Sequence, residues 1–116
     1  MAFPSEHIEQ VQTVSWFRKT YPGVKIFAIP NGGHRNKITA AKLKAEGVLP
    51  GVPDLFVPHF NLWIEMKMQK GGRLSESQKE MRDYLLDQCS HNYLMCEGFD
   101  DARLKITNFF NCLDNS

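Results

Sequence analysis

The chain has 116 residues, a formal net charge of +1 at pH 7, and 42% hydrophobic and 23% charged residues. This length fits one compact domain over residues 1–116, and the composition excludes a disordered or disulfide-stapled chain. No apolar run reaches the roughly 20 residues of a membrane span, no signal peptide is visible, and the three cysteines lack metal-ligand spacing. We therefore expect a cytoplasmic protein with reduced thiols.

The first part of the chain predicts a helix, a strand and a second helix. Residues 5–20 have helical periodicity, and we expect the side with Val11, Val14 and Phe17 to face a sheet while Glu9 points outward. An apolar run typical of a strand then covers residues 24–29, and an Ala- and Lys-rich helix is predicted over residues 39–46.

The second part predicts a β-hairpin followed by a helix, a strand and a helix. Residues 54–57 and 62–68 form the hairpin through the turn-rich segment 58–61. Ser75 and Gln78 match a capping box at the start of a helix that runs to about residue 89. The last strand and helix cover residues 93–96 and 100–113. The order α-β-α-β-β-α-β-α predicts an α/β sandwich.

Three charged residues of the hairpin suggest chemistry. Alternation along residues 62–68 places Glu65 and Lys67 on the same face of the strand, and a short hairpin brings Asp54 beside Glu65. Hard carboxylate oxygens are suitable ligands for Mg²⁺, which activates water and neutralises charge on a phosphodiester. A lysine beside the metal can position or deprotonate the water, or stabilise developing charge. A Glu-x-Lys strand alone is also typical of a solvated ion-pair face.

A third acid is expected from the first helix. Glu6 and Glu9 are both candidates, and we favour Glu6 because it shares a helical face with Gln10. Either acid could instead stabilise the first helical turn through the helix dipole. Gln78, just after the Lys67 strand, could orient a water or contact phosphate, or it could serve only as a capping partner.

Basic and glycine-rich segments are candidates for contacts with DNA phosphates. The loop from Pro30 to Arg35 offers backbone amides together with basic side chains, although a plain surface loop has the same composition. The predicted DNA-binding residues are Asn31, Gly32, His34 and Arg35 in this loop, and Lys42 and Arg73 in two clusters of basic residues.

Taken together in order and spacing, these short motifs resemble the VRR-NUC family, a branch of the PD-(D/E)XK nucleases, in its small stand-alone form common in phages. The resemblance covers about residues 5–98. It is carried by the motifs Ser5-Glu6-His7-Ile8-Glu9-Gln10, Pro30-Asn31-Gly32-Gly33-His34-Arg35, Ala40 to Gly47, Gly51-Val52-Pro53-Asp54, Ile64-Glu65-Met66-Lys67, Gly71-Gly72-Arg73-Leu74-Ser75 and Gln78. Met66 stands where leucine is more usual, and Glu76 where proline is common.

The resemblance implies a restriction-endonuclease-like core with a central mixed β-sheet flanked by helices. It also implies a homodimeric endonuclease that uses Mg²⁺ or Mn²⁺ on branched DNA such as Holliday junctions, in the host cytoplasm if the protein is phage-encoded. Asp54, Glu65 and Glu6 would be metal ligands, Lys67 the catalytic lysine, and Gln78 the glutamine that follows the lysine strand.

Other functions stay open on the sequence alone. The same site could cut ordinary duplex or single-stranded DNA, although 116 residues leave no room for a separate target-recognition domain. A DNA-binding module without catalysis, or an α/β interaction protein, would leave the order of Asp54, Glu65, Lys67 and Gln78 unexplained.

Overall fold

A computed structural model of the chain describes residues 3–30 and 37–114, and its elements follow the predicted order. Ser5 caps the first helix, since its hydroxyl accepts a hydrogen bond from the Ile8 amide at 3.2 Å. In chain order the elements are α1 (Glu6–Thr20), β1 (Phe27–Ala28), α2 (Lys37–Ala45), β2 (Leu55–Val57), the 3-10 turn η1 (Pro58–Phe60), β3 (Leu62–Lys67), α3 (Glu76–Asp83), the π-helical turn η2 (Tyr84–Gln88), β4 (Asn92–Glu97) and α4 (Phe99–Asp114).

The strands form one mixed four-stranded sheet in the order β1-β2-β3-β4. β1, β2 and β3 pair antiparallel, whereas β3 and β4 run parallel. The predicted hairpin between β2 and β3 is confirmed, and it turns through η1 and the left-handed residue Asn61. The parallel β3–β4 pair is joined by the crossover through α3 and η2.

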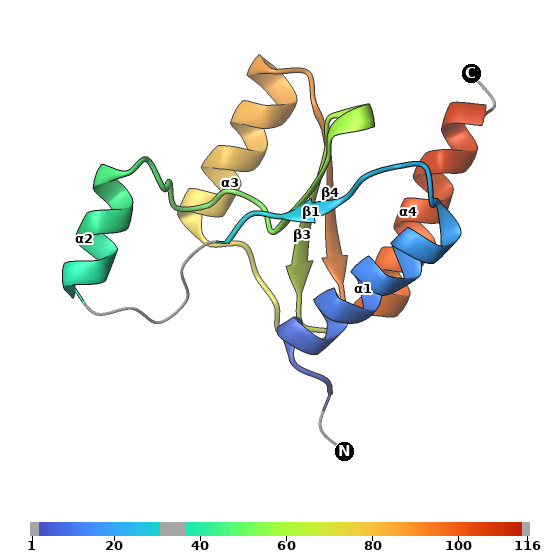
Figure 1. The fold of residues 1–116 in the computed structure, drawn as a ribbon, viewed down its shortest axis with the longest axis horizontal. Helices are drawn as coiled ribbons and strands as arrows, with labels where there is room; N and C mark the ends of the chain where they lie inside the picture. Colours follow the sequence, from blue (N-terminus) through green and yellow to red (C-terminus); the bar gives the residue numbers. More distant parts are fainter. Residues whose placement is uncertain (1–2, 31–36, 115–116) are drawn as a thin grey trace.

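The two faces of the sheet differ in character. Leu62, Ile64 and Met66 of β3 are buried on one face, where they form the core with Phe17 of α1 and Ile106 of α4. The opposite face of β3 carries the other set of alternating residues, as predicted. Figure 1 shows α1 and α4 together to one side of the strands and α3 to the other. The sheet is therefore a layer between two groups of helices.

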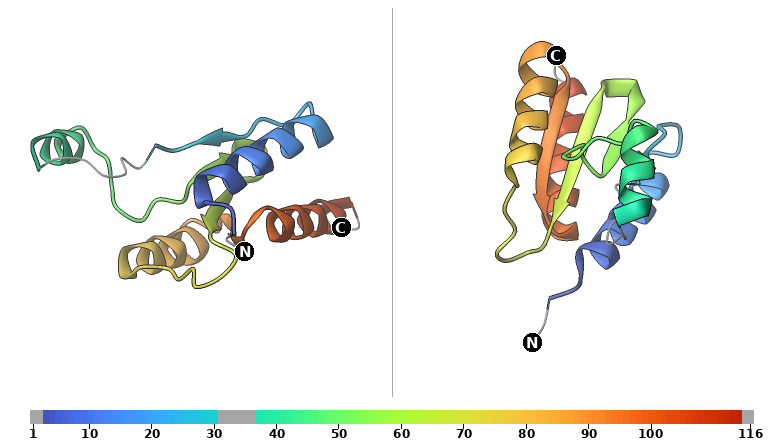
Figure 2. Two further views of the ribbon diagram at one scale, coloured as in Figure 1. Left: turned by 90° about the horizontal axis from the view of Figure 1, so that it is seen from below. Right: turned by 90° about the vertical axis from the view of Figure 1, so that its left-hand side faces the viewer.

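α2 lies apart from this layered body. None of its residues is buried, and the left view of Figure 2 shows it away from the strands. In the described part of the chain no helix is long and apolar enough to cross a membrane. The cysteines, Cys89, Cys96 and Cys112, are free thiols, as predicted.

Two predicted elements differ in extent from the observed ones. The strand expected over residues 24–29 shrinks to β1, because the Val24 amide donates to the Tyr21 carbonyl in a turn and the Ile26 carbonyl accepts from the Arg18 side chain. The helix expected over residues 75–89 is α-helical only to Asp83 and continues as the π-helical turn.

The orientation predicted for the first helix was correct for Phe17, which is buried in the core, and wrong for Glu9 and Val11. Glu9, expected to point outward, is 2% exposed, whereas Val11 of the expected buried stripe is 54% exposed. The Glu9 carboxylate accepts hydrogen bonds from the Gln69 side chain at 3.0 Å and from the Phe99 amide at 3.2 Å. Both bonds go to Oε1, and Oε2 is buried without a hydrogen-bond partner among the described residues. The two bonds to Oε1, at the positive end of α4, hold Glu9 in the interior, where hydrophobic periodicity predicts a surface residue. Gly98 is required here, because a Cβ at this position would lie 2.5 Å from Glu9 Oε2.

We expect the substitution Glu9→Ala to lower the free energy of unfolding by about 2–3 kcal/mol, because it leaves the buried donors of Gln69 and Phe99 without an acceptor. Urea denaturation followed by circular dichroism measures the loss. The matched control is Glu6→Ala, one turn earlier on the exposed side of α1, which should change stability by less than about 0.5 kcal/mol. Equal losses in the two variants would contradict a structural role for Glu9.

Candidate active site

The β2–β3 register brings the two predicted acidic residues together. Leu55 pairs with Ile64, so one further step along the antiparallel register places Asp54 opposite Glu65. Asp54 is held on both sides: its Oδ2 accepts from the Met66 amide at 2.8 Å, and its carbonyl accepts from the Ile29 amide at 2.8 Å. The end of the hairpin therefore fixes the position of the Asp54 carboxylate relative to β3.

Glu65 is an acid buried beside another acid. Its side chain is 2% exposed, and its Oε1 has no hydrogen-bond partner among the described residues. The pKa of Glu65 is raised from 4.5 to about 9. Burial is the largest cause, followed by a side-chain hydrogen bond with Asp54 and by the charge of Asp54, whereas the charge of Lys67 lowers the pKa. At neutral pH Glu65 thus retains its proton.

Lys67 is tied to the start of α3. Its Nζ donates a hydrogen bond to Gln78 Oε1 at 2.9 Å, and the same oxygen accepts from the Ser75 amide at 2.8 Å. The Ser75 hydroxyl in turn accepts from the Gln78 amide, which completes the predicted capping box. Gln78 is therefore both a capping partner and the direct partner of Lys67.

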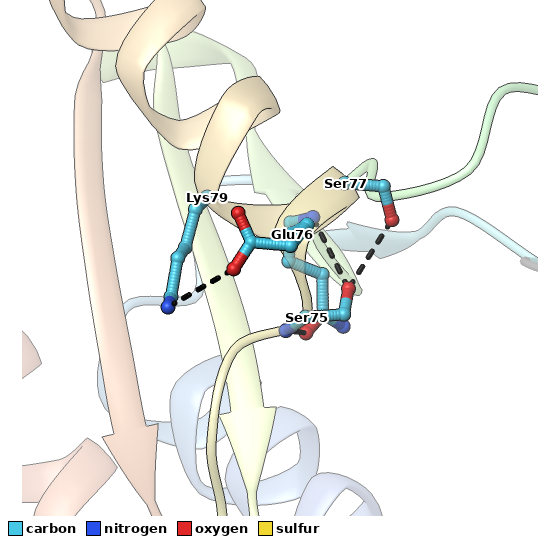
Figure 3. A network of polar contacts seen from close by, with 5 residues as sticks. Ser75, Glu76, Ser77 and Lys79 are labelled. Atoms are coloured by element: carbon cyan, nitrogen blue, oxygen red, sulfur yellow. Dashed lines mark hydrogen bonds and ion pairs between the residues drawn. The ribbon is translucent and has the colours of Figure 1, made fainter.

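Close packing brings the loop before Asp54 against the same helix start. Gly51 has a φ of +87°, and a Cβ at this position would clash with the Ser77 carbonyl. Figure 3 shows the surroundings of Ser75, whose hydroxyl lies 3.2 Å from that of Ser77. This contact positions the loop that carries Asp54 against the helix that holds Lys67.

The two acidic residues of α1, Glu6 and Glu9, have different surroundings. Glu6 is exposed in the first turn of α1, and its charge raises the pKa of Glu65 further, so it lies within electrostatic reach of the pair. Glu9 instead bonds Gln69 and Phe99. Over residues 3–30 and 37–114, no group of three or more His, Cys, Asp or Glu side chains is close enough together to hold a metal ion. The structure thus brings together Asp54, Glu65, Lys67 and Gln78, with Glu6 nearby.

Of the predicted DNA-binding residues, Lys42 and Arg73 lie in the described part of the chain. Asn31, Gly32, His34 and Arg35 lie outside the described residues. Lys42 is exposed on α2, which Figure 1 shows far from the strands. Arg73 is exposed on the segment between β3 and α3.

A groove of about 1120 Å³ reaches Asp54 from the side of α1 and β1. Val11, Val14 and Arg18 line it from α1, and Ile29 lines it from the opposite wall. This groove accounts for the exposure of Val11, which the sequence pattern had assigned to the core. A ligand of the carboxylate pair could therefore approach Asp54 along α1.

Sequence reasoning missed one further residue near the pair. Tyr93 of β4 has a buried hydroxyl without a hydrogen-bond partner among the described residues. Burial and then the Glu65 charge raise its pKa above the ordinary value. Strand alternation places Tyr93 on one face of β4, but the β3–β4 register that brings it beside Glu65 could not be read from the sequence.

The donor set suits a hard divalent cation. Two carboxylates meet at one point, and Oε1 of Glu65 is buried without a hydrogen-bond partner among the described residues. The raised pKa of Glu65 means that it retains a proton that a cation could replace. Mg²⁺ is commonly held by only one or two carboxylates and keeps several of its waters, so Asp54 and Glu65 are sufficient protein ligands. Lys67 adds a positive charge at the same face.

Comparisons with known proteins show a similarity in fold to a solved structure. No protein-family model matches the sequence, and no functionally curated protein matches it. Among solved structures the chain is similar to that of a VRR_NUC domain protein, with a TM-score of 0.74 and 22% sequence identity. The alignment covers 96% of this chain and 92% of that chain. The resemblance to VRR-NUC proteins is thereby confirmed for the fold, a mixed β-sheet flanked by helices.

Proposed function

We propose that this protein is a divalent-metal-dependent DNA endonuclease. The observation that carries the proposal is the buried Glu65 carboxyl beside Asp54, on the same sheet face as Lys67. An acid buried beside another acid costs stability unless a ligand compensates for it, and a cation is the ligand that reverses the repulsion. The VRR_NUC domain protein with the same fold adds support for nuclease chemistry.

In this proposal the chain's own residues have distinct tasks. Asp54 and Glu65 hold Mg²⁺ or Mn²⁺, and Glu6 contributes a third carboxylate from its position within electrostatic reach. The ion, when bound, supplies charge neutralisation and a lowered pKa for water. Lys67 orients the attacking water or stabilises charge on the phosphate oxygens, and Gln78 holds the lysine amine at 2.9 Å.

We further propose branched DNA, such as a Holliday junction, as the substrate and a homodimer as the active form. The resemblance to stand-alone VRR-NUC proteins supports both, and a twofold dimer presents two matching sites to the two scissile phosphates of a junction. The phosphate contacts are assigned to Asn31, Gly32, His34 and Arg35, and to Lys42 and Arg73.

Cleavage of a labelled four-way junction and of a linear duplex of the same sequence tests this function. We expect cutting of the junction with Mg²⁺ or Mn²⁺ and none with a chelator, and Asp54→Ala prepared identically excludes a contaminating nuclease. Equal cutting of both substrates would retain the nuclease and reject the junction preference. Junction binding without cutting in either metal would indicate a DNA-binding module instead.

A further inference from the structure

We propose that Tyr93 is a positioning residue of this site, whose hydroxyl donates a hydrogen bond to the Glu65 carboxylate when a divalent cation is bound there. The inference rests on the proposed function, because it requires a divalent cation on Glu65. It assigns a task to a side chain that neither the hairpin motif nor the α3 motif contains.

The sheet register places the two side chains side by side on one face. In the parallel β3–β4 pair, Tyr93 is the partner of Trp63, and Glu65 is the partner of Met95. Residues paired in register point to the same face, so Tyr93 and Glu65 are diagonal neighbours across adjacent strands. An aromatic side chain can bridge this separation. The Glu65 charge also acts on the Tyr93 hydroxyl, as expected for groups that face the same space.

The metal-free protein leaves both groups without a partner. The Tyr93 hydroxyl and Glu65 Oε1 are buried, and neither has a hydrogen-bond partner among the described residues. A carboxylate that holds a metal ion is in turn held by hydrogen bonds. A cation on Glu65 would therefore make the nearby Tyr93 hydroxyl a suitable donor, because a hydrogen bond to a charged acceptor is stronger than one to a neutral group.

Arg82, another charged group near the Tyr93 hydroxyl, is not its hydrogen-bond partner. Arg82 of α3 is also within electrostatic reach, but its Nε bonds the Asp83 carboxylate at 3.0 Å. A phenylalanine at position 93 would fill nearly the same volume and would remove a buried hydroxyl that has no partner. The hydroxyl is therefore expected to lower the stability of the metal-free protein and to contribute only when the site is loaded.

The substitution Tyr93→Phe tests this with two measurements that should move in opposite directions. We expect the affinity for Mn²⁺, measured by isothermal titration calorimetry, to fall about tenfold. We expect the melting temperature of the metal-free protein to stay the same or to rise. DNA cleavage should fall at limiting Mn²⁺ and recover at saturating Mn²⁺. The matched control is Tyr84→Phe, whose side chain is 56% exposed on η2 and which should change none of the three.

Each outcome decides the inference separately from the nuclease assignment. Unchanged Mn²⁺ affinity in Tyr93→Phe, a large fall in its metal-free melting temperature, or a failure to fold would overturn the role of Tyr93, even if the wild type cuts DNA. Weakened Mn²⁺ binding in a protein that cuts no DNA would support Tyr93 and reject the nuclease. A wild type that binds no Mn²⁺ would overturn the inference as well.

Discussion

Asp54→Asn and Lys67→Met are each expected to reduce DNA cleavage by about 10²–10⁴-fold, but only Asp54→Asn should weaken metal binding. Asparagine keeps an oxygen that can accept the Met66 amide, so the hairpin end is preserved while a ligand charge is lost. Methionine has nearly the length of lysine but lacks the ammonium that Gln78 binds. The two variants thus separate loss of the cation from loss of the group that acts beside it.

Single-turnover cleavage at saturating protein gives the rate, and calorimetric titration with Mn²⁺ gives the affinity. Lys79→Met is the control for the lysine, because Lys79 lies on the outer surface of α3 in an exposed pair with Glu76 at 3.5 Å (Figure 3). Asp100→Asn, in an exposed pair on α4, is the control for the aspartate. Wild-type rates in Lys67→Met, or wild-type Mn²⁺ affinity in Asp54→Asn, would remove that residue from the site.

The central part of the site could be predicted because local rules determine it. A hairpin with a short turn has few possible registers, and period-two alternation then decides which side chains share a face. These two rules were enough to place Asp54, Glu65 and Lys67 together. The capping box likewise determined where α3 begins, and with it the position of Gln78.

Long-range polar contacts were the main source of error. Glu9 is buried because it meets Gln69 and the Phe99 amide, which are 60 and 90 residues further along the chain. No pattern within α1 reveals such partners, and hydrophobic periodicity counts any carboxylate as a surface residue. The prediction for α1 was therefore wrong for Glu9, although Phe17 faces the core as predicted and the helix boundaries were correct to one residue.

The register between β3 and β4 was a second feature that the sequence could not predict. β3 and β4 are joined by a crossover through α3 and η2, so their relative register depends on how that connection packs. The sequence predicted that β4 exists and roughly where it lies. Tyr93 could be recognised as a neighbour of Glu65 only once the register was known.

The stability of the metal-free protein is expected to fall as pH rises from about 5 to about 9, because Glu65 has a pKa of about 9 in the folded state and 4.5 as its ordinary value. Over this range the unfolded chain has lost a proton that the folded chain still binds. The contribution of Glu65 is thus fully present below its ordinary pKa and lost as pH passes the folded value. The glutamine in the Glu65→Gln variant cannot ionise, so the variant should not lose stability as pH rises. At about pH 8.5 its melting temperature should exceed that of the wild type, by roughly 4–8 °C for each kcal/mol by which its free energy of unfolding is higher.

Metal binding should show the opposite dependence on pH. A cation must displace the proton that Glu65 retains, so we expect the apparent Mg²⁺ affinity to rise about tenfold per pH unit below pH 9. Calorimetry in two buffers of different ionisation enthalpy should report about one proton released per ion near pH 7.5. Melting curves with and without Mg²⁺ should then diverge as pH rises, since the ion removes the cost of ionising Glu65. Parallel curves, or binding without proton release, would mean that the cation binds somewhere other than this pair.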